Sequence, residues 1–434
     1  NTDIPSNIST DRTLSQYNTT LTTTIKLSGS ETLTIDATKT LTIDTDVTLE
    51  ITSGRTLTIA SGGTLTSTAG TLENDGTIAC SGTIATGSNF TGSTGLVEFA
   101  SVANYDASVA SDDRLSTSLD GNRTIANYMG AGTTKVILSG SETLTTSTHT
   151  LTIPASVTLQ VASERTLTIA SGGTLDSDAG TLDNDGIISC SGTITTSSNF
   201  TGTSSGLVSF ASVTAYDNSV IVGNRLSTAL GGERTIANYM GVGVGTTKGI
   251  LSGSETLTTS TYTLTISASV TLQVASGRTL TIAGAITKNG AITGAGDVIF
   301  SSIAAYDATS DNSSNTIGSA ITAATRTLNK YNTTGTTKVI ISNSETLTIN
   351  VAAEFTIASG VTLEIGSTET LTNAGIIVKN SGGTFTTTGT LTNNGLVLDK
   401  SASDELTFNT TGTTGTTSQT LNKNFTIDTS ETLT

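Results

Sequence analysis

The sequence predicts an all-β chain folded as a right-handed parallel β-solenoid, with three-sided coils of about 20–24 residues. Three observations predict this fold. The composition is rich in Thr, Ser and Gly, with only 12% charged and 4% aromatic residues. A five-residue phrase returns at long intervals, and a shorter apolar pattern returns every eight residues. Thr, Ile and Val favour strands, and no helical stripe of apolar residues is present.

The phrase Ser-Glu-Thr-Leu-Thr divides the chain into long repeats. Its copies lie at residues 30–34, 141–145, 254–258, 344–348 and 430–434. A lead-in that begins Arg-Thr-Leu or Arg-Thr-Ile and ends in Tyr precedes the first four copies. We expect this Tyr to anchor the boundary between repeats. The predicted organisation is a lead-in, four repeats and the start of a fifth: residues 1–27, 28–138, 139–251, 252–341, 342–428 and 429–434.

Leucines mark short strands within each repeat. In repeat 1 they stand at Leu33, Leu41, Leu49, Leu57 and Leu65, and Ile follows two residues after the first four. Alternation places Leu and Ile on one face of a strand and Thr on the other. Gly and Ser between the strands provide the backbone freedom that a corner needs. Four-residue strands cannot bury their apolar face alone, so we expect them to stack into coils around a continuous core.

The spacing of the phrase indicates that repeat 3 lacks a whole coil. The interval from its third to its fourth copy is shorter than the two intervals before it. The missing stretch lies within the segment 166–208, which corresponds to the shorter segment 279–298. The difference is about 23 residues, and three sides of six to eight residues make one coil of that size. We therefore expect five, five, four and four coils in the repeats. A left-handed hexapeptide helix has about 18 residues per coil, which favours the right-handed form.

Tandem Ig-like β-sandwich domains are the alternative fold. The intervals between copies of the phrase are close to the roughly 100 residues of a single sandwich domain. The eight-residue pattern inside each repeat speaks against such domains, because the strands of a sandwich are not usually copies of one another.

Charge and length limit the partners. The net charge is −16, and no cluster of Lys and Arg forms a groove for nucleic acid. No apolar run approaches the roughly 20 residues that span a bilayer, so we expect no membrane insertion.

Cys80 and Cys190 occupy matching places in repeats 1 and 2, and stacked repeats would hold them too far apart for a disulfide. We expect both to be free and buried.

Several residues carry candidate chemistry. Carboxylates on one face of a β-helix could cleave polysaccharide, and the candidates are Asp106, Asp112, Asp113, Asp183 and Asp185. Because acidic residues recur in several repeats and an active site is built once, we expect no enzyme. The turns at 73–76 and 183–186 could hold Ca²⁺, although an Asn-Gly or Asp-Gly turn explains them better. We expect no cofactor.

Thr-x-Thr phrases and sequons suggest surface roles. Flat ranks of outward Thr bind ice in some solenoids, but three-sided coils would distribute these phrases over every side. Among the Asn-x-Ser/Thr sequons, two pairs lie at matching places in different repeats. These are the glycosylation candidates: Asn18 with Asn332, and Asn89 with Asn199.

The run from Thr56 to Leu65, continuing through Asn74-Asp75-Gly76-Thr77-Ile78, resembles the Gly-Thr-Leu-Thr-Asn-x-Gly-Thr-Ile repeats of microbial surface proteins. These include β-helical adhesins and autotransporter passengers. The resemblance covers about half the chain and brings no catalytic residue with it. It implies a β-solenoid at the cell surface or outside the cell.

The sequence therefore predicts a structural subunit of an extracellular filament, sheath or surface layer that polymerises head to tail. Both ends carry the same lead-in, so the end of one chain could meet the start of the next. The candidate contact residues are Thr13, Leu14, Tyr17, Leu33, Phe425, Ile427 and Leu433. The alternative is an adhesin or glycan-binding stalk that uses the irregular loops near Tyr105, Tyr216 and Tyr306. A polysaccharide-active enzyme and an ice-binding protein are less favoured.

Overall fold

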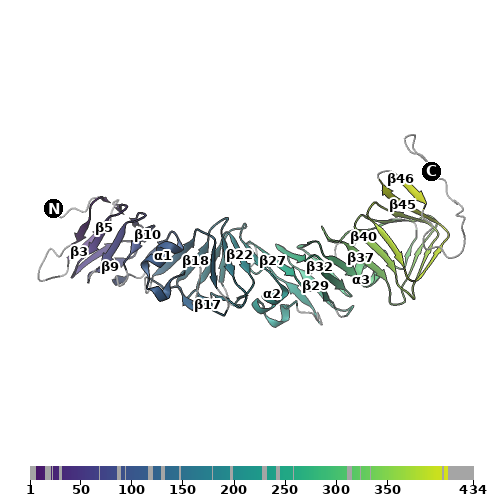
Figure 1. Cartoon of the computed structure of the whole chain (residues 1–434), viewed down its shortest axis with the longest axis horizontal. Coiled ribbons are helices and arrows are strands. Elements are labelled where there is room, and N and C mark those ends of the chain that lie inside the picture. The colour runs from purple at the N-terminus through teal and green to yellow at the C-terminus, as the bar shows by residue number, and fades with distance from the viewer. Residues whose placement is uncertain are drawn as a thin grey trace. The chain divides into compact units, whose positions relative to one another are not determined.

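The computed structural model describes most of the chain as two compact units. It describes residues 6–14, 21, 23–28, 32–67, 69–85, 89–92, 94–115, 121–128, 132–145, 148–177, 179–195, 199–226, 232–240, 245–257, 259–309, 315–322, 324–332, 334–402 and 405–408. Unit 1 comprises residues 1–211, 218–220 and 239–247, and unit 2 comprises residues 212–217, 221–238 and 248–434. Each unit consists of parallel strands stacked in coils (Figure 1).

Five stacks of strands make up unit 1. The longest is β1 (Asn7–Ile8), β4 (Leu33–Ile35), β7 (Thr56–Ile59), β10 (Thr77–Cys80), β13 (Leu96–Phe99), β15 (Thr133–Leu138), β18 (Val157–Val161), β21 (Thr181–Asn184) and β24 (Asn199–Thr201). Two stacks lie within residues 12–91: β2 (Arg12–Leu14), β5 (Thr40–Ile43), β8 (Thr64–Ser67) and β11 (Thr83–Ile84); and β3 (Thr23–Leu27), β6 (Val47–Ile51), β9 (Thr71–Asn74) and β12 (Asn89–Thr91). Two lie within residues 123–210: β14 (Arg123–Thr124), β17 (Thr150–Thr152), β20 (Thr174–Asp176) and β23 (Thr193–Ile194); and β16 (Glu142–Thr145), β19 (Thr166–Ile169), β22 (Ile187–Cys190) and β25 (Leu207–Phe210).

Unit 2 has the same construction. Its stacks are β26 (Arg234–Ile236), β29 (Thr263–Ile266) and β32 (Ala285–Lys288); β28 (Glu255–Thr256), β31 (Thr279–Ile282), β34 (Asp297–Phe300), β37 (Thr337–Ile341), β40 (Val361–Ile365) and β43 (Thr384–Thr387); β30 (Val270–Val274) and β33 (Ala291–Thr293); β35 (Ala320–Ile321), β38 (Thr346–Ile349), β41 (Thr370–Asn373) and β44 (Thr390–Asn393); and β36 (Thr325–Leu328), β39 (Glu354–Ile357), β42 (Ile376–Lys379), β45 (Leu396–Ala402) and β46 (Glu405–Phe408). The strand β27 (Thr246–Leu251) has residues in both units.

Short helices follow the Phe-containing strands. They are α1 (Val102–Ser108), α2 (Val213–Ser219) and α3 (Ile303–Asp307), with 3₁₀ turns η1 (Ser111–Asp113) and η2 (Val222–Asn224). In the described part of the chain, none of the helices is long and apolar enough to cross a membrane.

The expected β-solenoid is confirmed. Leu57 of β7 pairs with Leu33 of β4 on one side and with Ile78 of β10 on the other, and Ile78 then pairs with Val97 of β13. Two strands from other stacks lie between each pair of partners along the chain, so each of these coils has three sides. Within each unit the pairings are parallel, whereas a β-sandwich pairs its strands antiparallel. Among the described pairs, β45 with β46 is the antiparallel exception.

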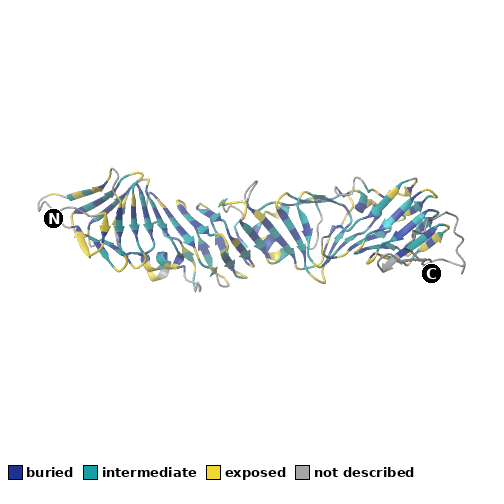
Figure 2. Ribbon diagram, turned by 90° about the horizontal axis from the view of Figure 1, so that it is seen from above, coloured by how far each residue is buried: buried dark blue, intermediate teal, exposed yellow. Residues whose placement is uncertain are grey.

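Inward Leu and Ile side chains form ladders through each unit, as the alternation predicts. Leu41, Ile43, Leu57 and Ile59 are all completely buried, and their Thr neighbours are less buried. Figure 2 shows this alternation of buried and intermediate residues along the strands, with exposed residues at the corners. Burying such a side chain contributes about 1.5–3 kcal/mol, so each added coil extends the core by several of these increments.

The missing coil is also confirmed. In repeat 2, β19 pairs with β22, and β22 pairs with β25. In repeat 3, β31 pairs directly with the Phe-containing strand β34. Ile282 therefore lies next to Phe300, and no residue corresponding to Cys190 separates them.

The Asn-x-Gly turns close coils from the inside. The Asn74 side chain is completely buried, and its Oδ1 accepts a hydrogen bond from the Gly76 N–H at 3.1 Å. Its Nδ2 donates to the Leu96 carbonyl of the next coil at 3.1 Å. A Cβ atom at Gly76 would lie 2.4 Å from the Arg55 carbonyl oxygen, so glycine permits this close approach. Asn184 and Asn373 bond to the next coil in the same way.

The repeated phrase does not keep one register. In repeats 1 and 4 its leucine faces inward, where Leu33 pairs with Leu57 and Leu347 with Leu371. In repeats 2 and 3 its glutamate takes the inward position, and Glu255 pairs with Leu280. In repeat 3 the leucine also stays inward, since Leu257 is completely buried, so the inward face of this strand holds a glutamate beside the apolar residues that the alternation predicts.

Candidate functional site

The strongest candidate site is the joint at which one repeat ends and the next begins. One such joint lies inside each unit. We call residues 96–138, from β13 through α1 to β15, joint A, and residues 297–341, from β34 through α3 to β37, joint B. Across joint A, Val97 pairs with Thr134, so the chain between these partners is longer than the coil from Ile78 to Val97. One stack thus continues through the joint, while the stacks that end in β11 and β12 give way to those that begin with β14 and β16.

Buried aromatic rings hold joint A together. The Tyr105 side chain is completely buried, with its ring centroid 5.4 Å from that of Phe99 in an edge-to-face arrangement. The Tyr105 hydroxyl accepts a hydrogen bond from the Ala126 N–H at 2.7 Å. The Tyr128 ring packs edge-to-face against Phe90 and Phe99, at 5.0 and 5.5 Å. Such aromatic pairs add about 0.5–1.5 kcal/mol beyond the burial of their area.

The helix and Tyr128 cover the strand edge at which a stack ends. Ser108 Oγ, at the end of α1, accepts a hydrogen bond from the Ile84 N–H of β11 at 2.9 Å. The Tyr128 hydroxyl donates to the Ser108 carbonyl at 2.6 Å. Tyr128 thus anchors the boundary between repeats, as the lead-in pattern predicts. Tyr239 makes the corresponding bonds to the carbonyls of Ile194 and Ser219.

The Tyr-Asp aspartates close loops. Asp106 Oδ1 accepts a hydrogen bond from the Leu115 N–H at 2.5 Å. Asp217 accepts one from the Leu226 N–H, and Asp307 accepts bonds from the N–H groups of Ile317 and Gly318. Burial raises the pKa of Asp106, Asp217 and Asp307 in each case. The repeated geometry gives these carboxylates a structural task at each place.

Joint B adds a carboxylate to the start of the helix. Glu345, from the repeated phrase, accepts hydrogen bonds from the N–H groups of Ile303 and Ala304, both at 2.9 Å. These are the first two N–H groups of α3, which have no partner within the helix. Phe300 again packs edge-to-face against Tyr306 and Tyr331, each with ring centroids 5.3 Å apart.

The corresponding glutamates of repeats 2 and 3 lack such partners. The Oε2 atoms of Glu142 and Glu255 are buried and have no hydrogen-bond partner among the described residues. Glu255 is only 3% exposed. Burial, and secondarily the charge of Asp217, raises the pKa of Glu255 to about 7. Burial and Asp106 raise the pKa of Glu142 in the same direction.

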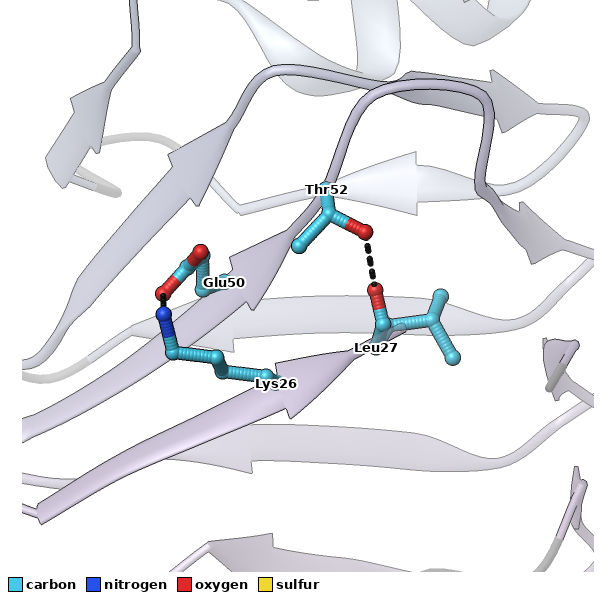
Figure 3. Close-up of polar contacts among 4 residues, drawn as sticks. All are labelled: Lys26, Leu27, Glu50 and Thr52. Carbon is cyan, nitrogen blue, oxygen red and sulfur yellow. Dashed lines mark hydrogen bonds and ion pairs between the residues drawn. The ribbon is translucent and has the colours of Figure 1, made fainter. Parts of the chain in front are cut away.

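The first described coil presents a strand edge. β3 is the outermost strand of its stack in the described part of the chain, and it pairs with β6. Figure 3 shows the two contacts that fix it there. Lys26 Nζ lies 2.6 Å from Glu50 Oε2, and Thr52 Oγ1 donates to the Leu27 carbonyl at 2.9 Å. The ion pair raises the pKa of Lys26.

The structure places the predicted contact residues in different environments. Thr13 is exposed on β2, whereas Leu14 is 7% exposed and faces the core. Leu33 is 3% exposed and pairs with Leu57 inside the stack, so it is a core residue rather than a contact residue. The remaining candidates lie outside the described residues: Tyr17, Phe425, Ile427 and Leu433.

The glycosylation candidates also differ from one another. Asn89 and Asn199 are exposed, and each Nδ2 donates to a Thr hydroxyl on the neighbouring strand. Asn332 is 1% exposed, and its Nδ2 donates to the Gly296 carbonyl at 2.8 Å. Because a glycan cannot attach to this buried amide in the folded chain, the prediction for Asn332 is wrong. Asn18 lies outside the described residues.

The other chemical candidates serve the turns and the core. Asp185 accepts hydrogen bonds from the Thr203 N–H and from Gln160 Nε2, both at 2.8 Å, and Asp183 accepts one from Thr201 Oγ1 at 3.1 Å. Asp113 lies in η1, and the Asp112 side chain lies outside what the structure describes. In the described part of the chain, no three His, Cys, Asp or Glu side chains gather where they could hold a metal ion.

The two cysteines are free and buried, as predicted. Burial raises the pKa of both thiols to about 12, which disfavours the reactive thiolate. Cys80 lies between Ile59 and Phe99 in its ladder, and Cys190 lies between Ile169 and Phe210.

The inward glutamates were not anticipated from the sequence, although a signal is present. Two residues after the Leu of the phrase, repeats 1 and 4 have Ile35 and Ile349. Repeats 2 and 3 have Thr146 and Thr259 at those positions. Without the second apolar residue, a shift of two positions lets the strand bury more apolar surface, because Leu257 then takes the inward place of Ile. The shift carries Glu255 into the inward place of Leu.

No family model matches this chain, and a search of curated proteins finds no similar sequence.

Proposed function

We propose that this chain is a structural subunit of an extracellular filament, sheath or surface layer, and that copies assemble head to tail by the joint found within the chain. The observation that carries the proposal is the exposure of the Ile25 side chain on β3. The corresponding residues at joints A and B, Val136 and Val339, are completely buried. Ile25 is partly exposed.

The two joints show what covers this position. Val136 pairs with Phe99 of the preceding strand β13, and Val339 pairs with Phe300 of β34. The proposed partner of Ile25 is therefore a parallel strand of a second copy, which would extend the stack of β3. An open sheet edge is a ready template for such pairing. A contact between two different ends of one molecule generates open fibres.

The far end of unit 2 offers two strand edges for this contact. β43 and β44 are the outermost strands of their stacks in the described residues. The third stack ends in β46, which pairs antiparallel with β45 and occupies its edge. A second copy would use the edges of β43 and β44, or displace β46. The predicted contact through Thr426–Thr434 lies outside the described residues.

Substitutions on β3 test the proposal. We expect Ile25→Asp to abolish concentration-dependent assembly in sedimentation velocity, because a charge would be buried in the new core. Thr24→Asp is the matched control, since Thr24 lies on the outward face of the same strand and is exposed. Circular dichroism establishes that both variants fold. Wild-type chains that stay monomeric at every concentration, or an Ile25→Asp variant that assembles normally, would refute the proposal.

An adhesin or glycan-binding stalk is the second candidate. Tyr105, Tyr216 and Tyr306 are buried and serve the core, so they are not a binding surface. The loop after α2, however, exposes two apolar side chains, with Ile221 62% and Val222 71% exposed. Binding on a glycan array that disappears in an Ile221→Ser/Val222→Ser variant would favour this function.

A further inference from the structure

The phrase Ser-Glu-Thr-Leu-Thr uses its glutamate in two opposite ways. Glu345 of repeat 4 accepts two hydrogen bonds from α3 and a third, at 3.3 Å, from the Ser342 N–H. Its charge is therefore balanced by backbone donors. Glu255 of repeat 3 has moved into the core and pairs with Leu280, which is 1% exposed. Its buried Oε2 has no partner among the described residues.

The charges around Glu255 are unfavourable to its ionised form. Asp217, which is 8% exposed, is the charged group that acts on Glu255, and it repels a second negative charge. Arg225 and Arg234 act on Asp217 and lower its pKa against the effect of burial. Both guanidinium groups favour the ionised form of Asp217, because an opposite charge stabilises a carboxylate. The neighbouring strand contributes Leu280 and Thr281, which carry no charge.

We propose that Glu255 is a proton-dependent switch in unit 2, which is tightly packed when Glu255 is protonated and loosened when it ionises. A protonated carboxyl is a neutral side chain that a Leu ladder tolerates, whereas a buried carboxylate with an unpartnered oxygen is strongly unfavourable. A bound cation is the other means of neutralising the carboxylates of Glu255 and Asp217. Ca²⁺ takes 6–8 oxygen ligands, and here Asp217 Oδ1 already accepts the Leu226 N–H. The proton is therefore the counter-charge that the geometry supports.

The direction of the pH effect follows from linkage. The folded pKa of Glu255, about 7, lies above the ordinary value of 4.5. The folded chain thus binds a proton that the unfolded chain has lost, and stability falls as pH rises from about 4.5 to 7. Above that range Glu255 is ionised in both states, and its burial is a full penalty. The packing of unit 2 around Glu255 is expected to be firm in mildly acidic solution and looser at alkaline pH.

Glu255→Gln tests the switch, with Glu345→Gln as the matched control on the same phrase. Hydrogen exchange of the peptide 250–257 is followed from pH 4 to 8 and corrected for the intrinsic pH dependence. We expect the two forms to agree at pH 4, where Glu255 is protonated in the folded and the unfolded chain, and Glu255→Gln to be at least about tenfold better protected at pH 8. Glu345→Gln should instead lose protection of α3 at pH 8, because it removes charge-balanced hydrogen bonds.

Two outcomes would overturn the switch. One is equal protection of wild type and Glu255→Gln at pH 8. The other is an increase in wild-type protection on adding Ca²⁺ at pH 8 that is absent in Glu255→Gln, since this would make the pair a cation site. Hydrogen exchange is measured at a protein concentration low enough for the chain to be monomeric. The result therefore does not depend on whether copies assemble.

Discussion

At the scale of single residues, the chain uses its chemically capable side chains to satisfy its own backbone. Asn74 closes a turn and reaches the next coil, and Asp106 closes a loop. Ser108 and Tyr128 occupy a strand edge that would otherwise lack partners. Such contacts are needed because buried backbone polar groups without a partner are costly. Their recurrence in several repeats is typical of structure rather than of catalysis.

Replacing a buried turn residue should therefore be costly. Asn74→Ala removes the acceptor of the Gly76 N–H and the donor to the Leu96 carbonyl, both inside the protein. We expect a loss of about 1–3 kcal/mol in the free energy of unfolding, measured by denaturant titration. Asn89→Ala is the control, since Asn89 is exposed, and it should change stability by less than about 0.5 kcal/mol. Similar effects of the two substitutions would contradict the role assigned to Asn74.

At the scale of elements, the coil is the unit of construction. Three-sided coils stack in register, and repeat 3 has one coil fewer than repeats 1 and 2 without loss of the joint. This tolerance follows because each coil contacts its neighbours alone, so that removal of a whole coil brings two compatible surfaces together.

A designed deletion should reproduce the natural one. Removing residues 77–95 takes out β10, β11 and β12 and brings β13 against β7, as β34 lies against β31. Ile59 would then neighbour Phe99, as Ile282 neighbours Phe300. We expect a folded chain with a cooperative thermal transition. Removing residues 77–86 alone leaves a partial coil and misplaces every later inward residue, so this control should not fold cooperatively. If both deletions behaved alike, whole coils would not be the unit of construction.

The sequence predicted the coils well because their signal is local. Leu57 and Ile59 alternate with Thr, a corner follows, and the pattern returns after eight residues. The joint was harder to predict, because its contacts connect residues far apart in the chain, such as Phe90 with Tyr128. The inward position of Glu255 was missed for a different reason. The phrase is identical in each repeat, and the register depends on a residue outside it, Thr259 in place of Ile.

At the scale of the whole molecule, the two joints suggest how one chain could be continued by another. Joint A and joint B pass a single stack from one repeat to the next, with Phe99 over Val136 and Phe300 over Val339. The first described coil has the same strand in β3, with Ile25 partly exposed at the matching position. A second copy that supplied the missing strand would make the contact between molecules equivalent to the contact between repeats.

Hydrogen exchange of residues 23–27 at low and high protein concentration tests this claim most directly. The account predicts that these amides become protected as concentration rises, because a second strand pairs with the edge of β3. The peptide around Leu49, on the neighbouring strand β6, should show no change, since that strand is already paired on both sides. Protection of residues 23–27 that does not depend on concentration would contradict assembly through this edge.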